Sequence, residues 1–313
     1  MSESRFPPVD RSGRRWASWA AGLAVVPPAL LVLLLFRYGI DVPYWDEWQL
    51  TRFFEADEQG SLSLSSFWTQ HIEHRLFFPR LLLFALGKVT AWNVSFEYAL
   101  NVLVASIGFL AVWRLVSSYI PEGMNRTSAR VLTSVSFFSL CQWENWTWGW
   151  QVAVFCCVAG VVWSIVLVER DSTASLLGAL FAAAIATFSF GNGLVVWPAL
   201  FVSLTLRRDR LWRATVWFAV GLACWLTYFW DFSSRPQTAA LPTQAEEVVR
   251  YLGYVTAFVG SPLVGWTGRG VLSCIVGSFG LAAAAFTFSS MRRVGLDSRW
   301  LFSLTLFAVG SGF

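Results

Sequence analysis

The sequence contains little charge and almost no histidine. Only 13% of the 313 residues are charged and two are histidines, whereas 56% are hydrophobic. Such a composition excludes an ordinary soluble globule. The sequence also lacks a Walker P-loop, a GxSxG motif, a Rossmann glycine pattern and a zincin motif. It therefore gives no support for ATP-driven transport or for the familiar hydrolase chemistries.

The cysteines form no recognisable framework. They lie within or at the ends of apolar runs, without CxxC spacing, so we expect free thiols that serve as small apolar residues. The five are Cys141, Cys156, Cys157, Cys224 and Cys274.

Long apolar runs make up most of the chain. The run from Val152 to Val168 carries no charge and is close to the length that a bilayer requires. Because a helix satisfies its own backbone hydrogen bonds in lipid, these runs predict spanning helices. We therefore expect an all-α, polytopic transmembrane helix bundle of about nine spans. The expected spans are 16–37, 96–117, 129–142, 151–168, 174–190, 193–206, 213–230, 270–290 and one that begins near 299.

The charge distribution predicts how this bundle is oriented. The arginines follow the positive-inside rule if the N-terminus is cytoplasmic, which makes the outer face the acidic one. We expect a disordered cytoplasmic tail over residues 1–15 and a multi-pass domain over 16–313 in the plasma (inner) membrane. The chain ends inside an apolar run, so we expect it to be a truncated version of a longer protein.

Two segments are expected to lie on the outer face without crossing the membrane. The first is the loop 38–95, in which Leu76 to Val89 is expected to be a helix lying in the interface. The second is the segment 231–269. Its apolar run within 243–265 is interrupted by Gly-Ser-Pro at 260–262, which predicts an interfacial or re-entrant helix.

An acidic pair, Asp46 and Glu47, follows the first expected span and is flanked by Tyr44, Trp45 and Trp48. Aromatic residues gather at membrane interfaces, so one interpretation is two solvated acids in an interfacial belt. In the other, one carboxylate takes a proton from an attacking hydroxyl as a general base. Adjacent residues on a helix cannot both point into one pocket, so one acid would work and the other would support it.

Both histidines of the chain lie in the same loop. His71 and His74 are at positions i and i+3, so on a helix they share a face. Together with Asp46 or Glu47 they could hold a divalent metal ion, although the HxEH spacing matches no zincin pattern.

A contact with phosphate or sugar is the preferred role for this stretch. Arg75 and Arg80 would supply fixed positive charge for a phosphate leaving group, and Glu73 completes the polar cluster. The alternative is ordinary surface charge, with arginines that extend along apolar surface toward water.

Four tryptophans surround one carboxylate, Glu144, in the segment CQWENWTWGWQ at 141–151. A tryptophan-rich turn is expected at an interface regardless of function. Indole faces also stack on sugars, and a carboxylate at this depth is costly unless it serves a site or has a cationic partner. The candidate substrate-binding residues here are Trp143, Glu144 and Trp146.

On these residues the chain resembles the glycosyltransferase-C superfamily. Its members are integral membrane enzymes that use polyprenyl-phosphate-linked sugars, and they include protein O-mannosyltransferases and lipid A aminoarabinose transferases. Asp46 and Glu47 match the acidic motif that opens the family's long outer loop. Residues 71–80 resemble the element in which histidine and proline lead into an amphipathic helix, and Glu144 lies in the second outer loop. The resemblance covers roughly residues 16–170.

The resemblance implies an enzyme, an inverting hexosyl- or pentosyltransferase. It would transfer a sugar from a polyprenyl-phosphate-linked donor to a lipid or glycan acceptor at the outer face. Asp46, or in second place Glu47, would deprotonate the acceptor hydroxyl. Arg75 and Arg80, with the histidines or a divalent metal ion, would stabilise the developing phosphate charge. Glu144 would bind sugar hydroxyls or an ion.

The main alternative is a permease or a flippase for lipid-linked intermediates, without catalytic activity. Ion-coupled transporters usually place several ionisable residues at mid-membrane, and few are found here, so this alternative is weaker. A third is a noncatalytic scaffold in an envelope-polymer assembly, for which the tryptophan turn would be a partner surface. Nucleic acid is not an expected partner.

Overall fold

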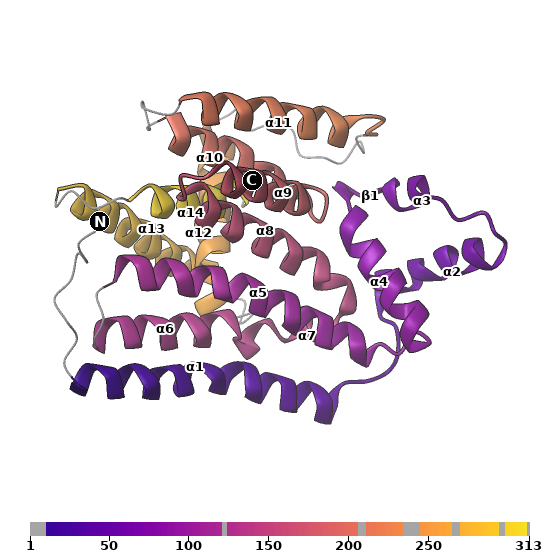
Figure 1. The fold of residues 1–313 in the computed structure, drawn as a ribbon, viewed down its shortest axis with the longest axis horizontal. Coiled ribbons are helices and arrows are strands. Elements are labelled where there is room, and N and C mark those ends of the chain that lie inside the picture. Colours follow the sequence, from indigo (N-terminus) through magenta and orange to yellow (C-terminus); the bar gives the residue numbers. More distant parts are fainter. Residues whose placement is uncertain are drawn as a thin grey trace. The chain divides into compact units, whose positions relative to one another are not determined.

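The computed structural model describes residues 11–120, 124–205, 211–233, 245–264, 270–293 and 298–311 (Figure 1). These residues are almost entirely helical, which confirms the predicted all-α class, and their only sheet is a two-stranded hairpin. The chain forms two compact units. One comprises Met1–Phe67 and Phe78–Val166, and the other Trp68–Phe77 and Leu167–Phe313.

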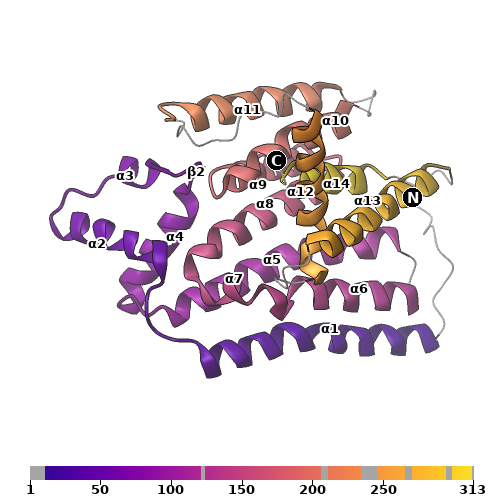
Figure 2. The same cartoon turned by 180° about the vertical axis from the view of Figure 1, so that it is seen from behind.

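The first unit combines long helices with several short ones. Its elements are α1 (Arg11–Tyr38), η1 (Trp45–Leu50), α2 (Thr51–Glu58), α3 (Leu64–Trp68), α4 (Phe77–Thr90), α5 (Ser95–Tyr119), α6 (Met124–Phe137), η2 (Leu140–Gln142), α7 (Trp143–Thr147), η3 (Gly149–Gln151) and α8 (Val152–Val168). Helices α1, α5 and α6 pack against one another (Figures 1 and 2). The cavity described below lies where α1, α5 and α7 meet.

Two adjacent prolines, Pro27 and Pro28, lie inside α1. A proline has no amide hydrogen, so the carbonyl four residues before it loses its helical donor. For Pro28 that carbonyl belongs to Ala24, and the hydroxyl of Ser134 on α6 donates to it over 2.6 Å. Ser134 is fully buried. This bond satisfies the carbonyl that lacks its amide donor and attaches α1 to α6.

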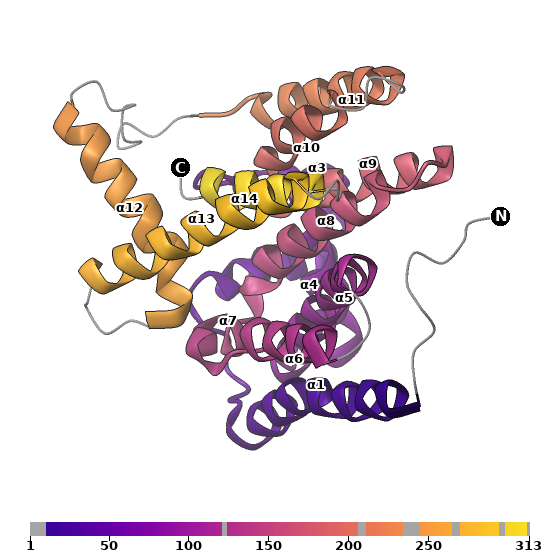
Figure 3. The same cartoon turned by 90° about the vertical axis from the view of Figure 1, so that its left-hand side faces the viewer.

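The second unit contains the hairpin and the later helices. Its elements are β1 (Gln70–His71), β2 (His74–Arg75), α9 (Thr173–Thr187), η4 (Gly191–Val195), α10 (Val196–Thr205), α11 (Leu211–Phe229), α12 (Ala245–Val264), α13 (Gly270–Arg293) and α14 (Arg299–Gly310). Helix α12 crosses α13, as Figure 3 shows. Two glycines allow the backbones of these helices to touch. A Cβ on Gly277 would overlap the carbonyl oxygen of Thr256, and one on Gly260 would overlap that of Ser273.

Helix α12 differs from the prediction for the segment 231–269. It continues through Gly260, Ser261 and Pro262 to Val264 instead of breaking there. Pro262 leaves the carbonyl of Phe258 without an amide donor, and the hydroxyl of Ser261 donates to that carbonyl over 3.0 Å. A local side chain thus compensates for the proline. Residues 234–244 and 265–269 of this segment lie outside the described residues.

Among the described residues, three helical stretches are long and apolar enough to cross a membrane, namely Ser95–Tyr119, Gly149–Val168 and Gly270–Arg293. Four further apolar helices are shorter: Gly22–Tyr38, Thr173–Thr187, Gly191–Thr205 and Arg299–Gly310. These lengths and compositions are those of a membrane protein. The complete set of nine spans stays a prediction.

Several predicted boundaries differ from the structure. Helix α1 begins at Arg11, inside the predicted tail 1–15, of which residues 1–10 lie outside the described part of the chain. Helix α6 ends at Phe137, before the end of the predicted span 129–142. The helix predicted over Leu76 to Val89 is present as α4, where Pro79 is tolerated because the first turn of a helix needs no amide donor.

Candidate functional site

Glu47 is completely buried and its carboxylate is held by backbone amides. Its Oε2 accepts from the amide of Tyr44 over 2.7 Å, and its Oε1 accepts from the amides of Gly149 and Trp150. Burial raises the pKa of the Glu47 carboxyl, and these amides oppose the increase. Glu47 therefore fastens η1 to η3 and has no free oxygen for a substrate.

Asp46, the neighbouring acid, is half-exposed. Its Oδ1 accepts from the side-chain amide of Gln49 over 3.0 Å. The preceding Trp45 has φ of 47°, in the left-handed region, where a bulky residue costs about 1–3 kcal/mol. The two adjacent acids therefore have different surroundings, one buried and one half-exposed.

A cavity of about 650 Å³ lies in the first unit. Its lining consists of aromatic rings, apolar groups, the hydroxyl-bearing Thr147 and one carboxylate, Glu144, which is the only charged group among the described residues that line it. The indole nitrogen of Trp148 donates to the carbonyl of Tyr44 over 3.1 Å and holds two of the rings together. The lining residues are Tyr38, Gly39, Ile40, Val42, Pro43, Tyr44, Tyr98, Trp143, Glu144, Thr147 and Trp148.

The tryptophans of the 141–151 segment have different roles. Trp143 is 60% exposed and lines the cavity. Trp146 is 1% exposed, stacks on Phe155 with ring centroids 4.6 Å apart, and donates to the carbonyl of Ser139 over 3.0 Å. No face of the Trp146 ring is therefore accessible in this structure, and its substrate-binding role stays a prediction.

The histidines lie on a β-hairpin in the second unit. The predicted metal site instead assumes that they share one face of a helix. His71 and His74 are direct cross-strand partners of β1 and β2. They are neighbours through strand pairing and not through helical periodicity, because the chain reverses between them. Among the described residues, no group of three or more His, Cys, Asp or Glu is placed to hold a metal ion.

His74 is oriented by its surroundings. Its Nδ1 accepts from the amide of Gly191 over 3.2 Å, and its ring stacks on Phe190 at a centroid distance of 4.0 Å. Burial lowers the pKa of His74 to about 4, while nearby Glu73, whose side chain is exposed, opposes the decrease. His74 is thus neutral at pH 7, with its proton on Nε2.

Arg75, in strand β2, is buried and binds backbone carbonyls on either side of the hairpin in sequence. Its guanidinium donates to the carbonyls of Trp68 and Tyr228, each over 3.0 Å, and to the carbonyl of Trp230. Burial lowers the pKa of Arg75, and the charge of Asp231 opposes this. These bonds use three of the five N–H donors of the guanidinium, and its burial keeps the others from a phosphate in this conformation.

Arg80 is also buried, within the first unit, with no exposed surface. It donates to the carbonyl of Phe67 over 3.2 Å, and its guanidinium carbon lies 5.8 Å from the centroid of the Phe53 ring. Neither of the two predicted phosphate-binding arginines is therefore accessible to a phosphate in this conformation.

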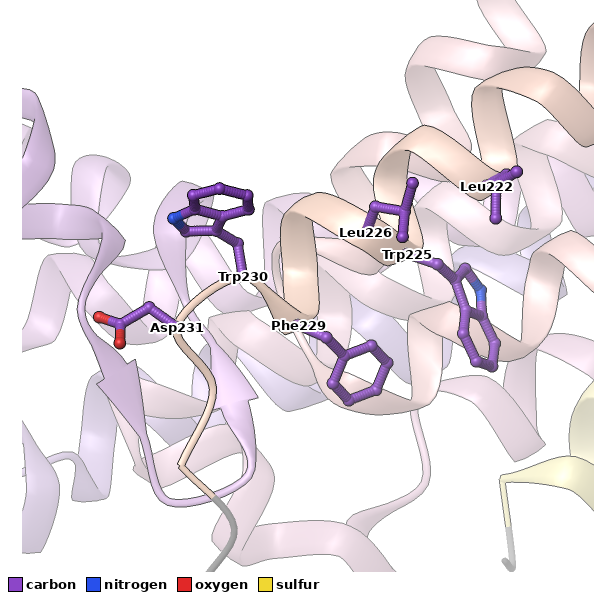
Figure 4. A pocket seen from close by; sticks show the side chains of 6 residues that line it. All are labelled: Leu222, Trp225, Leu226, Phe229, Trp230 and Asp231. Carbon is purple, nitrogen blue, oxygen red and sulfur yellow. The ribbon is translucent and has the colours of Figure 1, made fainter.

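A second cavity, of about 530 Å³, lies on α11 in the second unit. Figure 4 shows the side chains of Leu222, Trp225, Leu226 and Phe229 along the helix, and those of Trp230 and Asp231 in the turn that follows. Among the described residues that form this lining, Asp231 alone is charged. An apolar groove of this kind suits a hydrocarbon chain better than a polar ligand.

Sequence reasoning missed Tyr38 and Tyr98 as cavity residues. Both lie at the end of a long apolar helix, where interfacial aromatic residues are expected, and that position was the available signal.

No protein-family model matches the chain, and neither a curated protein nor a solved structure matches it.

Proposed function

We propose that this protein is a membrane glycosyltransferase that moves a sugar from a polyprenyl-phosphate donor to a hydroxyl acceptor with inversion. The observation that supports this most is the aromatic cavity with its single carboxylate, Glu144. Aromatic rings offer flat apolar surfaces that fit the C–H faces of a sugar. A carboxylate accepts hydrogen bonds from sugar hydroxyls. Glu144 is therefore assigned to the sugar.

Asp46 is assigned the role of general base. Glu47 is used by backbone amides, whereas Asp46 is half-exposed and follows the cavity residue Tyr44 by two positions. Asp46 takes the proton from the acceptor hydroxyl, whose oxygen forms a bond to the anomeric carbon. The bond between that carbon and the phosphate oxygen breaks on the opposite face, and polyprenyl phosphate leaves.

The proposal includes nine spans and an active site at the outer face of the plasma membrane. It is supported by the charge distribution and by the apolar helices of both units. A cysteine at the exposed position Glu58 of α2, placed in a cysteine-free background, tests the orientation. A membrane-impermeant maleimide should label it in intact cells, and labelling only after lysis contradicts the proposed face.

The function itself is tested with the purified full chain in native lipids. Mass spectrometry identifies lipids that co-purify, and the same preparation is assayed for sugar transfer. Asp46→Asn should abolish turnover and enrich a bound polyprenyl-phosphate sugar, because binding remains while chemistry stops. Glu144→Gln should raise KM for the donor with a smaller effect on kcat.

The exposed Glu55 of α2 provides the matched control, and Glu55→Gln should behave as wild type. Full turnover by Asp46→Asn would remove the assignment of the base. Co-purification of bulk phospholipid alone, with no transfer by wild type, would instead favour the permease and scaffold hypotheses.

A further inference from the structure

A polyprenyl-phosphate donor needs a cation for its phosphate, and the two arginines expected to supply it are buried and bonded to carbonyls. The aromatic cavity has no basic residue among its described lining residues. A cation next to the cavity would supply the charge that the lining lacks. The need for such a cation rests on the proposed function, and the residue that supplies it would deepen that function.

Arg37, in the last turn of α1, is placed beside the cavity. Its guanidinium carbon lies 5.2 Å from the centroid of the ring of Tyr38, which is a lining residue. The side chain of Arg37 is exposed, and it makes no hydrogen bond or ion pair within the described part of the chain. A guanidinium in this state keeps all its donors available, and two of them can bind a phosphate in parallel.

Apolar side chains lead to this position along α1. Leu30, Leu33 and Phe36 are exposed, the last by 91%, and together they present a surface on which a hydrocarbon chain can lie. An isoprenoid chain along α1 would bring its terminal phosphate to the end of the helix. The sugar would then enter the cavity toward Trp143 and Glu144.

We propose that Arg37 binds the phosphate of the polyprenyl-phosphate donor, with the sugar in the aromatic cavity and the isoprenoid chain along α1. The competing role of Arg37 is structural, since a cation in the last turn of a helix interacts favourably with the helix dipole. A lysine at position 37 keeps that interaction but loses the planar fork of donors. The two roles can therefore be separated by substitution.

Arg52 offers a matched control. It is exposed, belongs to α2 in the same unit, and its guanidinium carbon also lies 5.2 Å from the centroid of the following aromatic ring, that of Phe53. Arg52 does not line the cavity, and it does not lie at the end of a long apolar helix as Arg37 does. Arg52→Ala removes an equivalent charge and cation–π contact elsewhere on the surface, together with the bond that its guanidinium donates to the side chain of Gln49 over 2.9 Å.

The test measures binding of tritiated farnesyl phosphate to the full chain in phosphatidylcholine nanodiscs. Arg37→Ala should weaken binding about 10- to 100-fold, the loss expected for charge-assisted hydrogen bonds. Arg37→Lys should recover part of the affinity, and Arg52→Ala should bind as wild type. Unlabelled farnesol and phosphatidylglycerol should compete poorly, because the site needs both the phosphate and the isoprenoid chain.

Equal binding by wild type and Arg37→Ala overturns the inference, as does equal competition by farnesol. Equal competition by phosphatidylglycerol overturns it too, because Arg37 would then contact lipid headgroups in general. Sugar transfer assayed on the same preparations separates this inference from the proposed function. Transfer with an unchanged donor KM in Arg37→Ala rejects only the role of Arg37. Binding that depends on Arg37, without any transfer by wild type, rejects only the transferase.

Discussion

The hydroxyl of Ser134 on α6 donates to the carbonyl oxygen of Ala24 on α1 over 2.6 Å. Ala24 lies four residues before Pro28, so the hydroxyl replaces the amide donor that proline lacks. Helix α1, which the prolines interrupt, is thereby stabilised by α6. Substitutions of Ser134 and of Pro28 should therefore be coupled in their effects on the free energy of unfolding.

Ser134→Ala should lower the free energy of unfolding by about 1–3 kcal/mol, because it leaves a buried carbonyl without a donor. Pro28→Ala restores the helical amide, so Ser134→Ala should cost clearly less in that background. A double-mutant cycle of denaturant unfolding in detergent micelles measures the difference. Ser106→Ala is the control, since Ser106 bonds a carbonyl within its own helix over 2.7 Å. An identical cost of Ser134→Ala in both backgrounds contradicts the prediction.

Gly277 should be intolerant of any side chain. Gly277→Ala would place a methyl group on the carbonyl oxygen of Thr256, so α12 and α13 would have to separate, at a cost of at least about 1–3 kcal/mol. Gly280 lies in the same helix, and a Cβ there meets nothing within 4 Å. Gly280→Ala should therefore be neutral or stabilising, by up to about 1 kcal/mol. Thermal unfolding of both variants tests the contrast, and similar melting temperatures would argue against close packing of these helices.

Substitutions of Glu47 and Asp46 should have different effects on the free energy of unfolding. Glu47→Gln replaces an acceptor oxygen by an amide group that faces backbone donors, and should cost about 2–4 kcal/mol. Asp46→Asn should change stability by less than about 1 kcal/mol, because its carboxylate is half-exposed. Urea unfolding of the two variants provides the comparison. A stable Glu47→Gln protein would mean that this carboxylate does not fasten η1 to η3.

His74 should make stability depend on pH. The unfolded chain takes up a proton near pH 6.5, whereas folded His74 does so only near pH 4. The unfolded state therefore binds more protons between these values, and the free energy of unfolding should fall by about 1–3 kcal/mol as pH decreases from 6.5 to 4. His74→Gln should remove this slope from unfolding curves measured across that range. His71→Gln should retain the pH dependence of the free energy of unfolding. If His71→Gln removed it and His74→Gln did not, the responsible group would be His71.

Trp146 and Trp143 should respond differently to truncation. Trp146→Ala leaves a cavity beside Phe155 and should cost about 3–5 kcal/mol. Trp143→Ala should leave the melting temperature nearly unchanged, because its ring is exposed, but should weaken donor binding. Melting curves and binding isotherms of the two variants together test this division. A loss of binding only in Trp146→Ala, without loss of stability, would reverse it.

The helices could be predicted from the sequence because an apolar run of bilayer length has few alternative structures. The uncharged run Val152–Val168, for example, is α8. The roles of the polar residues could not be predicted in this way. Asp46 and Glu47 are chemically alike, and what separates them is the amide of Gly149, 102 positions away in the chain. Arg75 was predicted to be a phosphate ligand because nothing local indicates the carbonyls that surround it.

The bond from Arg75 to the carbonyl of Tyr228 spans 153 positions of the chain. At roughly 5–20 residues per second, the ribosome completes α11 about 8–30 s after it has made the hairpin. During that interval the guanidinium of Arg75 has neither the carbonyl of Tyr228 nor that of Trp230 to bind. The hairpin therefore reaches its final conformation late in biosynthesis, and a chain released before α11 is made would expose it to quality-control proteases.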